Sequence, residues 1–238
     1  MRPRATDDVA PRGASRLDLA PAALAARRLG VYGGSFDPPH AGHLWVAERA
    51  KEAFDLDHVV FVPARRPPHK PGRVLAPDGD RLAMLALLFG RRDWVSAWPG
   101  ELRRAGPSYT FDTLATFRAG CAPEAELFLV LGSDNLSGLP RWHRAEELLG
   151  LAQPIVVRRT GAALDASALE GAAFADLDPA LRARVRAGFV EVEVYDVTAT
   201  DLRARLEEGG SEGPDGLVRR GLPPELGEYI RLRRLYRR

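Results

Sequence analysis

Short apolar runs alternate with amphipathic segments along most of the chain. Five of these runs, bounded by glycine or proline, read as buried strands. They are 29–33, 58–64, 94–98, 126–132 and 154–159. The segments between them have helical spacing and good helix formers: 43–54, 78–90, 109–119 and 142–150. Strands that alternate with helices predict an α/β fold, here a Rossmann-like, doubly wound parallel sheet with right-handed crossovers.

The pattern loosens after residue 160. Residues 161–188 are rich in alanine, 189–197 alternates as a strand does, and 198–210 reads as a capped helix that ends at two glycines. A final amphipathic helix is expected over 222–236. These helices are too short to be stable alone. We therefore expect them to form a small C-terminal helical subdomain on the carboxyl edge of the sheet.

The domain organisation follows from these patterns. Residues 1–27 lack periodic apolar character and are expected to form a disordered extension. Residues 28–160 are expected to form the Rossmann-like core. Residues 161–238 are expected to complete the same domain with one strand and the helical cap.

Composition adds limits on function and location. The chain has 238 residues, 45% hydrophobic and 28% charged, and a net charge of +2 that is too small to indicate a nucleic-acid partner. Residues 219–238 hold seven arginines, and this basic patch reads as a solvated helix face, with RNA binding as the alternative. The single cysteine, Cys121, fits a reducing compartment. With no apolar run long enough to span a membrane and no secretory signal, a cytoplasmic protein is expected.

The stretch "GGSFDPPHAGH", residues 33–43, directly follows the first predicted strand. In open α/β sheets, ligands bind at this end of the strands. Gly33 and Gly34 allow close backbone approach and can point N–H groups at an anion, and the next helix presents its N-terminus to the same place. His40 and His43 are three apart and can face one side of the first helical turn. The combination indicates a polyphosphate site.

Each part of this stretch also has a simpler interpretation. A Gly-Gly pair alone reads as a turn, and a single histidine is usually structural. The His-x-x-His pair could bind a metal ion, but no third ligand is evident nearby. The order strand, Gly-Gly, Asp-Pro, His-x-x-His and helix is more specific than any of its parts and favours the phosphate site.

With this stretch the chain resembles the nucleotidyltransferase superfamily that carries the HxGH motif. Over residues 29–236 it resembles bacterial nicotinate-mononucleotide adenylyltransferases. Further stretches lie in the family's order, namely "PARRPPHK" (63–70), "PSYTFDTL" (107–114), "LGSDNLSGLPRWHRAEELL" (131–149), "VTATDLRARL" (197–206) and "LPPELGEYIRLRRLY" (222–236). The resemblance implies a nucleotide-binding core that transfers the adenylyl group of ATP to nicotinate mononucleotide in NAD biosynthesis, giving deamido-NAD and pyrophosphate. It also implies Mg²⁺ held mainly by the ATP phosphates, with no metal site built from protein side chains.

The same resemblance implies roles for individual residues. Those expected to bind ATP are Gly33, Gly34, Ser35, Phe36, His40, His43, Lys70, Asp134, Thr198 and Arg203. Of these, His40, His43 and Arg203 are expected to be catalytic. Taken singly, Lys70 could be a surface lysine, Asp134 a turn or cap residue, and Thr198 the cap of an ordinary helix. The segment "VTAT" stands where the family usually has "ISST" or "ISAT", so the phosphate contact of Thr198 is expected to persist with altered geometry.

The acceptor is expected to meet a second set of residues. By resemblance, Ser108, Tyr109 and Thr110 would lie near the nicotinate carboxylate, and Trp142 would stack on the pyridine ring. From its own position beside a proline, Trp142 reads better as a core residue. Some relatives carry asparagine where this chain has Ala64, so no contact from that side chain is expected.

Three other interpretations remain open. A related adenylyltransferase could use phosphopantetheine or nicotinamide mononucleotide as the acceptor. A synthetase-like protein would need a lysine-rich loop, which two lysines in the whole chain make difficult to build. A non-catalytic nucleotide- or RNA-binding module is the third, and the intact His40, His43 and Arg203 argue against it. The expected partners are ATP and nicotinate mononucleotide, without membrane or nucleic acid, and the sequence does not determine the oligomeric state.

Overall fold

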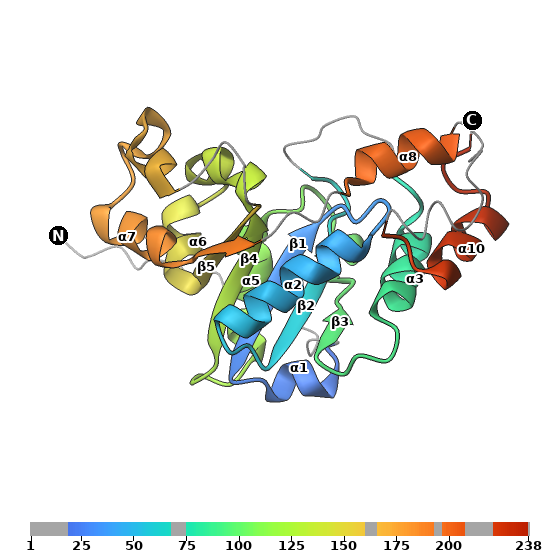
Figure 1. Cartoon of the computed structure of the whole chain (residues 1–238). Coiled ribbons are helices and arrows are strands. Elements are labelled where there is room, and N and C mark those ends of the chain that lie inside the picture. Colours follow the sequence, from blue (N-terminus) through green and yellow to red (C-terminus); the bar gives the residue numbers. More distant parts are fainter. Residues whose placement is uncertain (1–18, 68–74, 160–165, 193–196, 208–220, 238) are drawn as a thin grey trace.

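The computed structural model of the protein describes residues 19–67, 75–159, 166–192, 197–207 and 221–237. Within them, parallel strands form one sheet in the order β3-β2-β1-β4-β5-β6 (Figure 1). The strands are β1 (Arg28–Gly34), β2 (His58–Pro63), β3 (Val95–Ala97), β4 (Glu126–Gly132), β5 (Gln153–Arg159) and β6 (Phe189–Val192). The chain begins in the middle of the sheet, runs to one edge and then returns to build the other half. This confirms the predicted doubly wound parallel sheet and puts its switch point between β1 and β4.

The helices lie largely where their periodicity predicts them. The structure contains α1 (Pro21–Ala25), α2 (Ala41–Ala53), α3 (Asp78–Phe89), α4 (Gly100–Arg103), α5 (Thr110–Gly120), α6 (Ala145–Leu151), α7 (Pro179–Ala187), α8 (Ala199–Glu207) and α10 (Pro224–Leu232), with 3₁₀ helices η1 (Ser133–Arg141), η2 (Ala166–Glu170) and η3 (Ala172–Phe174). The start of one helix differs from the prediction, and the backbone shows why. The helix expected from residue 142 starts at Ala145, because Arg144 adopts a left-handed backbone with φ 54°.

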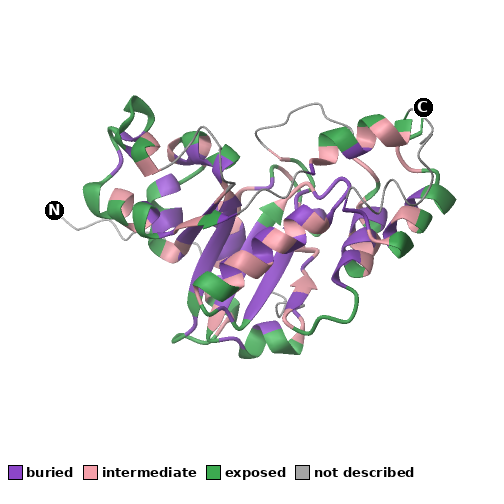
Figure 2. Ribbon diagram, viewed as in Figure 1, coloured by how far each residue is buried: buried purple, intermediate pink, exposed green. Residues whose placement is uncertain are grey.

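Both faces of the sheet are covered by helices, and the strand interiors are the most buried part of the molecule (Figure 2). Alternate residues of each strand point to opposite faces. In β2, Val60 and Val62 join a core cluster that also contains residues of α1, α5, α6 and α7. Val59 and Phe61 join a second cluster with residues of α2, α3, α8 and α10. Strands buried on both faces explain the continuous apolar runs in the sequence.

The expectation of disorder up to residue 27 is wrong for residues 19–27. Helix α1 lies in this segment, and Leu19, Ala23 and Ala26 are buried in the first core cluster. The apolar surface comes mostly from small alanines, which give too weak a periodic signal to predict a helix. Residues 1–18 lie outside the described residues.

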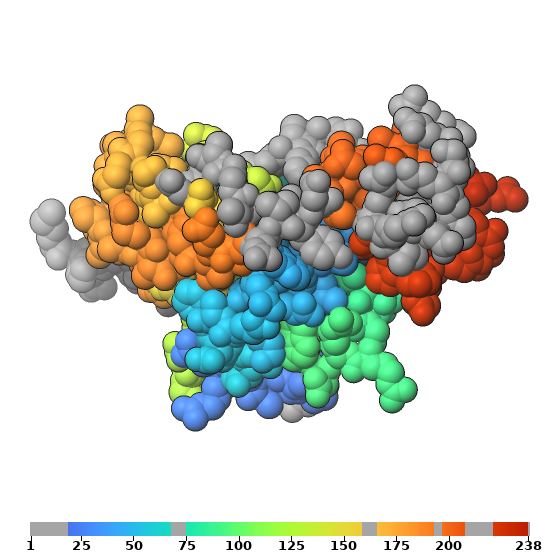
Figure 3. Space-filling view, in the orientation of Figure 1, coloured from blue at the N-terminus to red at the C-terminus, as the bar shows by residue number. Residues whose placement is uncertain are grey.

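The C-terminal part divides into two groups of elements. η2, η3 and α7 lie beside β5 and α6, and β6 completes the sheet next to them, whereas α8 and α10 lie on the other side of the view near α3 (Figure 1). In the space-filling view these orange and red segments occupy the upper left and upper right of the molecule, above the blue and green first half (Figure 3). The helix expected over 222–236 ends at Leu232. In the part of the chain that is described, no helix has the length and apolar character needed to cross a membrane.

Candidate active site

The loop 33–43 folds back over the end of β1. Gly34 lies under the ring of Phe36, where a Cβ would come within 2.8 Å of the ring carbon Cζ, whereas Gly33 faces open space. Phe36 has a left-handed backbone with φ 47°, and the peptide bond between Asp37 and Pro38 is cis. The two glycines, which were expected to serve the same purpose, therefore differ. Gly34 accommodates an aromatic ring, and only Gly33 leaves its surface open to a ligand.

The two histidines of the loop lie together at the start of α2. His40 is the N-cap residue of this helix, and the ring centroids of His40 and His43 are 3.8 Å apart. The backbone N–H of His40 donates to Nδ1 of His43 at 3.2 Å. In a neutral His43 the proton is then on Nε2, the nitrogen farther from the backbone. The predicted pairing of the imidazoles at the helix N-terminus is thus present, with His43 set up as a donor.

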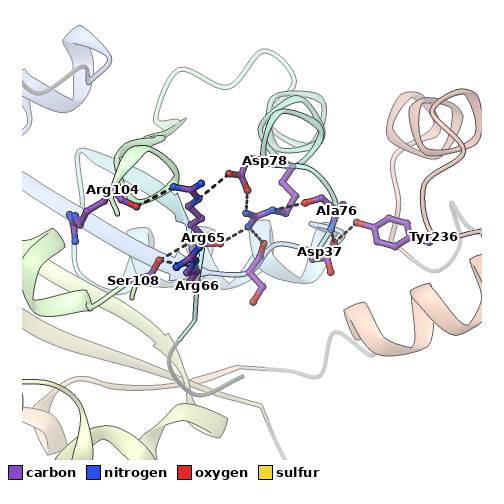
Figure 4. Close-up of polar contacts among 11 residues, drawn as sticks. Asp37, Arg65, Arg66, Ala76, Asp78, Arg104, Ser108 and Tyr236 are labelled. Atoms are coloured by element: carbon purple, nitrogen blue, oxygen red, sulfur yellow. Dashed lines mark hydrogen bonds and ion pairs between the residues drawn. The ribbon is translucent and has the colours of Figure 1, made fainter. Parts of the chain in front are cut away.

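Two arginines from distant parts of the chain contact the backbone of the same loop. Nη1 of Arg203, on α8, donates to the carbonyl of Asp37 at 2.5 Å, and its Nη2 donates to the hydroxyl of Thr200. Arg81, on α3, is completely buried. Its guanidinium donates to the carbonyl oxygens of Ser35 at 2.9 Å, Ala64 at 2.7 Å and Ala76 at 3.2 Å, and to the Asp78 carboxylate (Figure 4). We call the loop 33–43 together with Arg203 and Thr198 the phosphate cluster.

Thr198 is placed as the cap of α8. Its hydroxyl oxygen accepts the backbone N–H of Asp201 at 3.1 Å, and the hydroxyl donates to the carboxylate of the same residue. This is the arrangement of an ordinary N-cap. The role of Thr198 in binding phosphate stays a prediction.

A second group of residues lies near the ends of β2 and β4. The ring of Tyr109, the N-cap residue of α5, stacks on His143 with centroids 4.3 Å apart and an angle of 24°. Trp142 follows η1 and is half-buried against the first core cluster. The expected "SYT" and "PRW" segments are thus brought together. We call Tyr109, Thr110, Trp142 and His143 the aromatic cluster; His143 was missed, because a histidine beside a tryptophan shows no pattern of its own.

Ser108 has a structural task in this arrangement. Its side chain is buried, and its oxygen accepts the backbone N–H groups of Arg65 at 3.0 Å and Arg66 at 3.2 Å (Figure 4). These bonds attach the start of α5 to the chain leaving β2. The binding of the mononucleotide by Ser108 stays a prediction, and its hydroxyl oxygen already accepts two backbone N–H groups of the protein.

Buried Glu101, on α4, supports the same segment. The hydroxyl of Thr113 donates to its carboxylate at 2.6 Å. Burial raises the pKa of Glu101, against the opposing effect of hydrogen bonds from Thr113 and Ser108. A buried acid at this position was not predicted from the sequence.

Asp134 lies just past the end of β4, across the switch point from Gly33. Its side chain is exposed and lies so close to Gly132 that a Cβ there would come within 2.5 Å of Oδ1. This position is at the ligand-binding end of the strands, and the contact of Asp134 with ATP stays a prediction. Lys70 lies outside the described residues. Among the described residues, no group of three or more His, Cys, Asp or Glu side chains is placed to hold a metal ion.

Comparison with known proteins decides the family. A family model described as cytidylyltransferase-like matches residues 31–205. A Thermomicrobium roseum protein named "Probable nicotinate-nucleotide adenylyltransferase" is 40% identical over 210 residues, covering 88% of this chain and 92% of the relative. A Dehalococcoides mccartyi protein of the same name is 36% identical over 216 residues, covering 90% of this chain and 100% of the relative. The chain belongs to the nicotinate-nucleotide adenylyltransferase family.

Solved structures agree with this family assignment at the level of the fold. Plasmodium falciparum nicotinic acid mononucleotide adenylyltransferase complexed with NaAD matches with a TM-score of 0.66 and 19% identity, over 88% of this chain and 97% of that one. The same protein complexed with APC matches with a TM-score of 0.65 and 18% identity. At these identities the likeness concerns the doubly wound architecture alone.

Proposed function

We propose that this member of the nicotinate-nucleotide adenylyltransferase family transfers the adenylyl group of ATP to nicotinate mononucleotide, giving deamido-NAD and pyrophosphate in NAD biosynthesis. The observation that carries the proposal is that two unlike clusters lie at the carboxyl edge of one sheet. The phosphate cluster offers histidines and an arginine, and the aromatic cluster offers flat rings beside a helix start. The single cysteine also fits the reducing cytoplasm, where we place the reaction.

The chemistry needs alignment more than proton transfer. An oxygen of the 5′-phosphate of the mononucleotide forms a bond to the α-phosphorus of ATP. The bond from that phosphorus to the bridging oxygen breaks, and pyrophosphate leaves with the electron pair. The nucleophile is already an anion at neutral pH, so no general base is required. Binding in line and stabilisation of the charge on the leaving group are the contributions left to the protein.

The phosphate cluster is suited to the charge on ATP. Nε2–H of His43 would donate to a phosphate oxygen, and its other nitrogen is occupied by the helix backbone. The N-terminus of α2 adds the partial positive charge of the helix dipole. Arg203 supplies a permanent charge beside the loop. Together these groups would hold ATP and favour the departure of pyrophosphate.

A divalent metal ion would fit this site through the phosphates of the substrate. No described cluster of protein ligands is available for it, and the Asp37 carboxylate accepts hydrogen bonds from protein groups. Mg²⁺ commonly binds phosphate oxygens and keeps several waters. We propose that Mg²⁺ reaches the site with ATP, where it would neutralise part of the charge on the phosphates.

The aromatic cluster is suited to the pyridine ring. Trp142 and the Tyr109–His143 stack offer ring faces, which contribute about equally to nicotinate and nicotinamide. Thr110 begins α5, so its N–H is among the donors that a helix start leaves without an intrahelical acceptor. Hydrogen bonds from such donors to a carboxylate are roughly twice as strong as those to a neutral amide. Selection of the acid would therefore come from the helix start, and general affinity from the rings.

Pyrophosphate release tests the proposal directly. We expect turnover with ATP and nicotinate mononucleotide, and a kcat/KM at least about tenfold higher than with nicotinamide mononucleotide. Trp142→Ala should weaken both acceptors and leave the ratio between them. Equal use of both mononucleotides would remove the acid specificity. Turnover with ATP and phosphopantetheine, but with neither mononucleotide, would assign the phosphopantetheine adenylyltransferase activity. ATP binding without pyrophosphate release in the presence of any of these acceptors would indicate a non-catalytic module.

A further inference from the structure

A buried carboxylate near the centre of the loop 33–43 accepts hydrogen bonds from two other parts of the chain. Asp37 is 2% exposed. Its Oδ1 accepts the backbone N–H of Ala76 at 3.1 Å and the hydroxyl of Tyr236 at 2.7 Å (Figure 4). Tyr236 lies 199 positions away in the sequence, in the turn that follows α10. The end of the chain therefore bonds directly to the loop that follows the first strand.

The backbone around Tyr236 is shaped to make this contact. Tyr236 itself has φ 60° and Arg234 has φ 54°, a left-handed conformation that residues other than glycine seldom adopt. The tyrosine ring packs against the second core cluster. Burial and the neighbouring Asp37 charge raise the pKa of the Tyr236 hydroxyl, which therefore stays protonated and donates. Unfavourable backbone conformations of this kind persist where the surrounding structure holds them in place.

We propose that Tyr236 is a positioning residue for adenylyl transfer, since its hydroxyl, acting through Asp37, holds the loop in the shape that sets His40 and His43 toward the nucleotide. This rests on the proposed function of the phosphate cluster. Asp37 lies three positions before His40, and its carbonyl is the group that Arg203 contacts. The ring of Phe36, the preceding residue, meets His43 edge-to-face with centroids 5.1 Å apart. A shift of Asp37 would thus displace the histidines and the arginine together.

The same C-terminal segment provides a matched control. The hydroxyl of Tyr229, on α10, donates to Oδ1 of Asp80 on α3, also at 2.7 Å, and Asp80 is 3% exposed. Hydrogen bonds from Arg233 and Tyr229 lower the pKa of Asp80, so this acceptor is a carboxylate as well. Asp80 belongs to helix α3 and not to the loop 33–43. The two tyrosines therefore make the same kind of bond, and only one of them reaches the loop.

The test compares Tyr236→Phe with Tyr229→Phe. Each variant removes one hydroxyl and keeps the ring. We expect both to lower Tm by a few degrees, roughly what the loss of one hydrogen bond produces in a domain of this size. Only Tyr236→Phe should lower kcat, by about tenfold, because a small misplacement of catalytic groups has a large effect on rate. KM for nicotinate mononucleotide should stay within about twofold of wild type in both variants, since the aromatic cluster is untouched.

The outcomes separate this inference from the proposed function. An active wild type with equal kcat values in the two variants overturns the positioning role and leaves the function in place. An inactive wild type overturns the proposed function, and this inference with it. If Tyr236→Phe does not fold, Asp37→Asn replaces it, because an amide oxygen can accept the same two bonds more weakly. A loss of kcat smaller than about tenfold is expected there, because the bond from the Tyr236 hydroxyl is weakened and not removed. A wild-type kcat in Asp37→Asn overturns the inference.

Discussion

The tautomer of His43 allows a test that separates its two nitrogens. Nδ1 accepts the backbone N–H of His40 at 3.2 Å, so this nitrogen supports the start of α2. Nε2 then carries the proton and is the donor assigned to phosphate. Replacement by alanine would remove both contributions at once. His43→Asn keeps an acceptor near the place of Nδ1 and has no group at the place of Nε2, whereas His43→Gln extends its amide toward Nε2.

The size of the effect follows from the loss of one preorganised donor. Removing such a donor from a site where charge develops usually lowers kcat by about 10²–10³, or about 2.7–4 kcal/mol in the barrier. We expect this loss for His43→Asn, with Tm close to wild type because the local bond to His40 persists. His43→Gln should retain more of kcat and lose more stability. KM for ATP should change less than kcat, since the contact strengthens as charge moves to pyrophosphate.

The assay is pyrophosphate release at saturating ATP and nicotinate mononucleotide, with thermal unfolding measured on the same preparations. A folded His43→Asn protein whose kcat stays within about threefold of wild type would refute the assignment of Nε2 as a donor. A larger loss of kcat in the Gln variant than in the Asn variant would instead show that the contact with the His40 backbone is the decisive one.

Two further substitutions test the framework of the site. Arg81→Met should lower the free energy of unfolding by about 3–5 kcal/mol in urea titrations, because three carbonyl oxygens and Asp78 lose a buried partner; a loss below about 1 kcal/mol would contradict this. Burial raises the pKa of Glu101 in the folded protein above its value in the unfolded chain. The protonated side chain therefore contributes fully to stability below the unfolded pKa, and this contribution is lost as the pH rises through the folded pKa. Unfolding at several pH values should therefore show Glu101→Gln gaining stability relative to wild type as the pH rises above 4.5, the ordinary pKa of a glutamate, and a difference independent of pH would argue against this origin.

The sheet and its switch point could be predicted because the strands are buried on both faces. Such strands appear as continuous apolar runs, and β2 and β4 are examples. The loop after β1 was equally predictable, since its glycines, prolines and histidines form neither a good helix nor a good strand. Helix α1 was missed for the opposite reason. Its buried face is made of small residues such as Ala23 and Ala26, which resemble the composition of an unstructured segment.

The contacts that shape the site could not be predicted. Asp37 and Tyr236 are 199 positions apart, and nothing in either local sequence indicates the other. Arg81 reads as one charged residue on an amphipathic helix, yet it is the buried donor to three carbonyl oxygens. The sequence identifies which residues have suitable chemistry. Their partners depend on the way in which the C-terminal helices pack, and short helices of weak periodicity carry little of that information.

The two C-terminal groups of elements lie on different sides of the site and contact different parts of it. η3 and α7 pack against η1 and α6, which carry or adjoin the aromatic cluster. Helix α8 bonds to the loop 33–43 through Arg203. The segment after α10 bonds to the same loop through Tyr236 (Figure 4). The described elements of the last third of the chain thus form two groups. One group supports the acceptor side and the other supports the ATP side, so that each side of the proposed reaction has its own structural support.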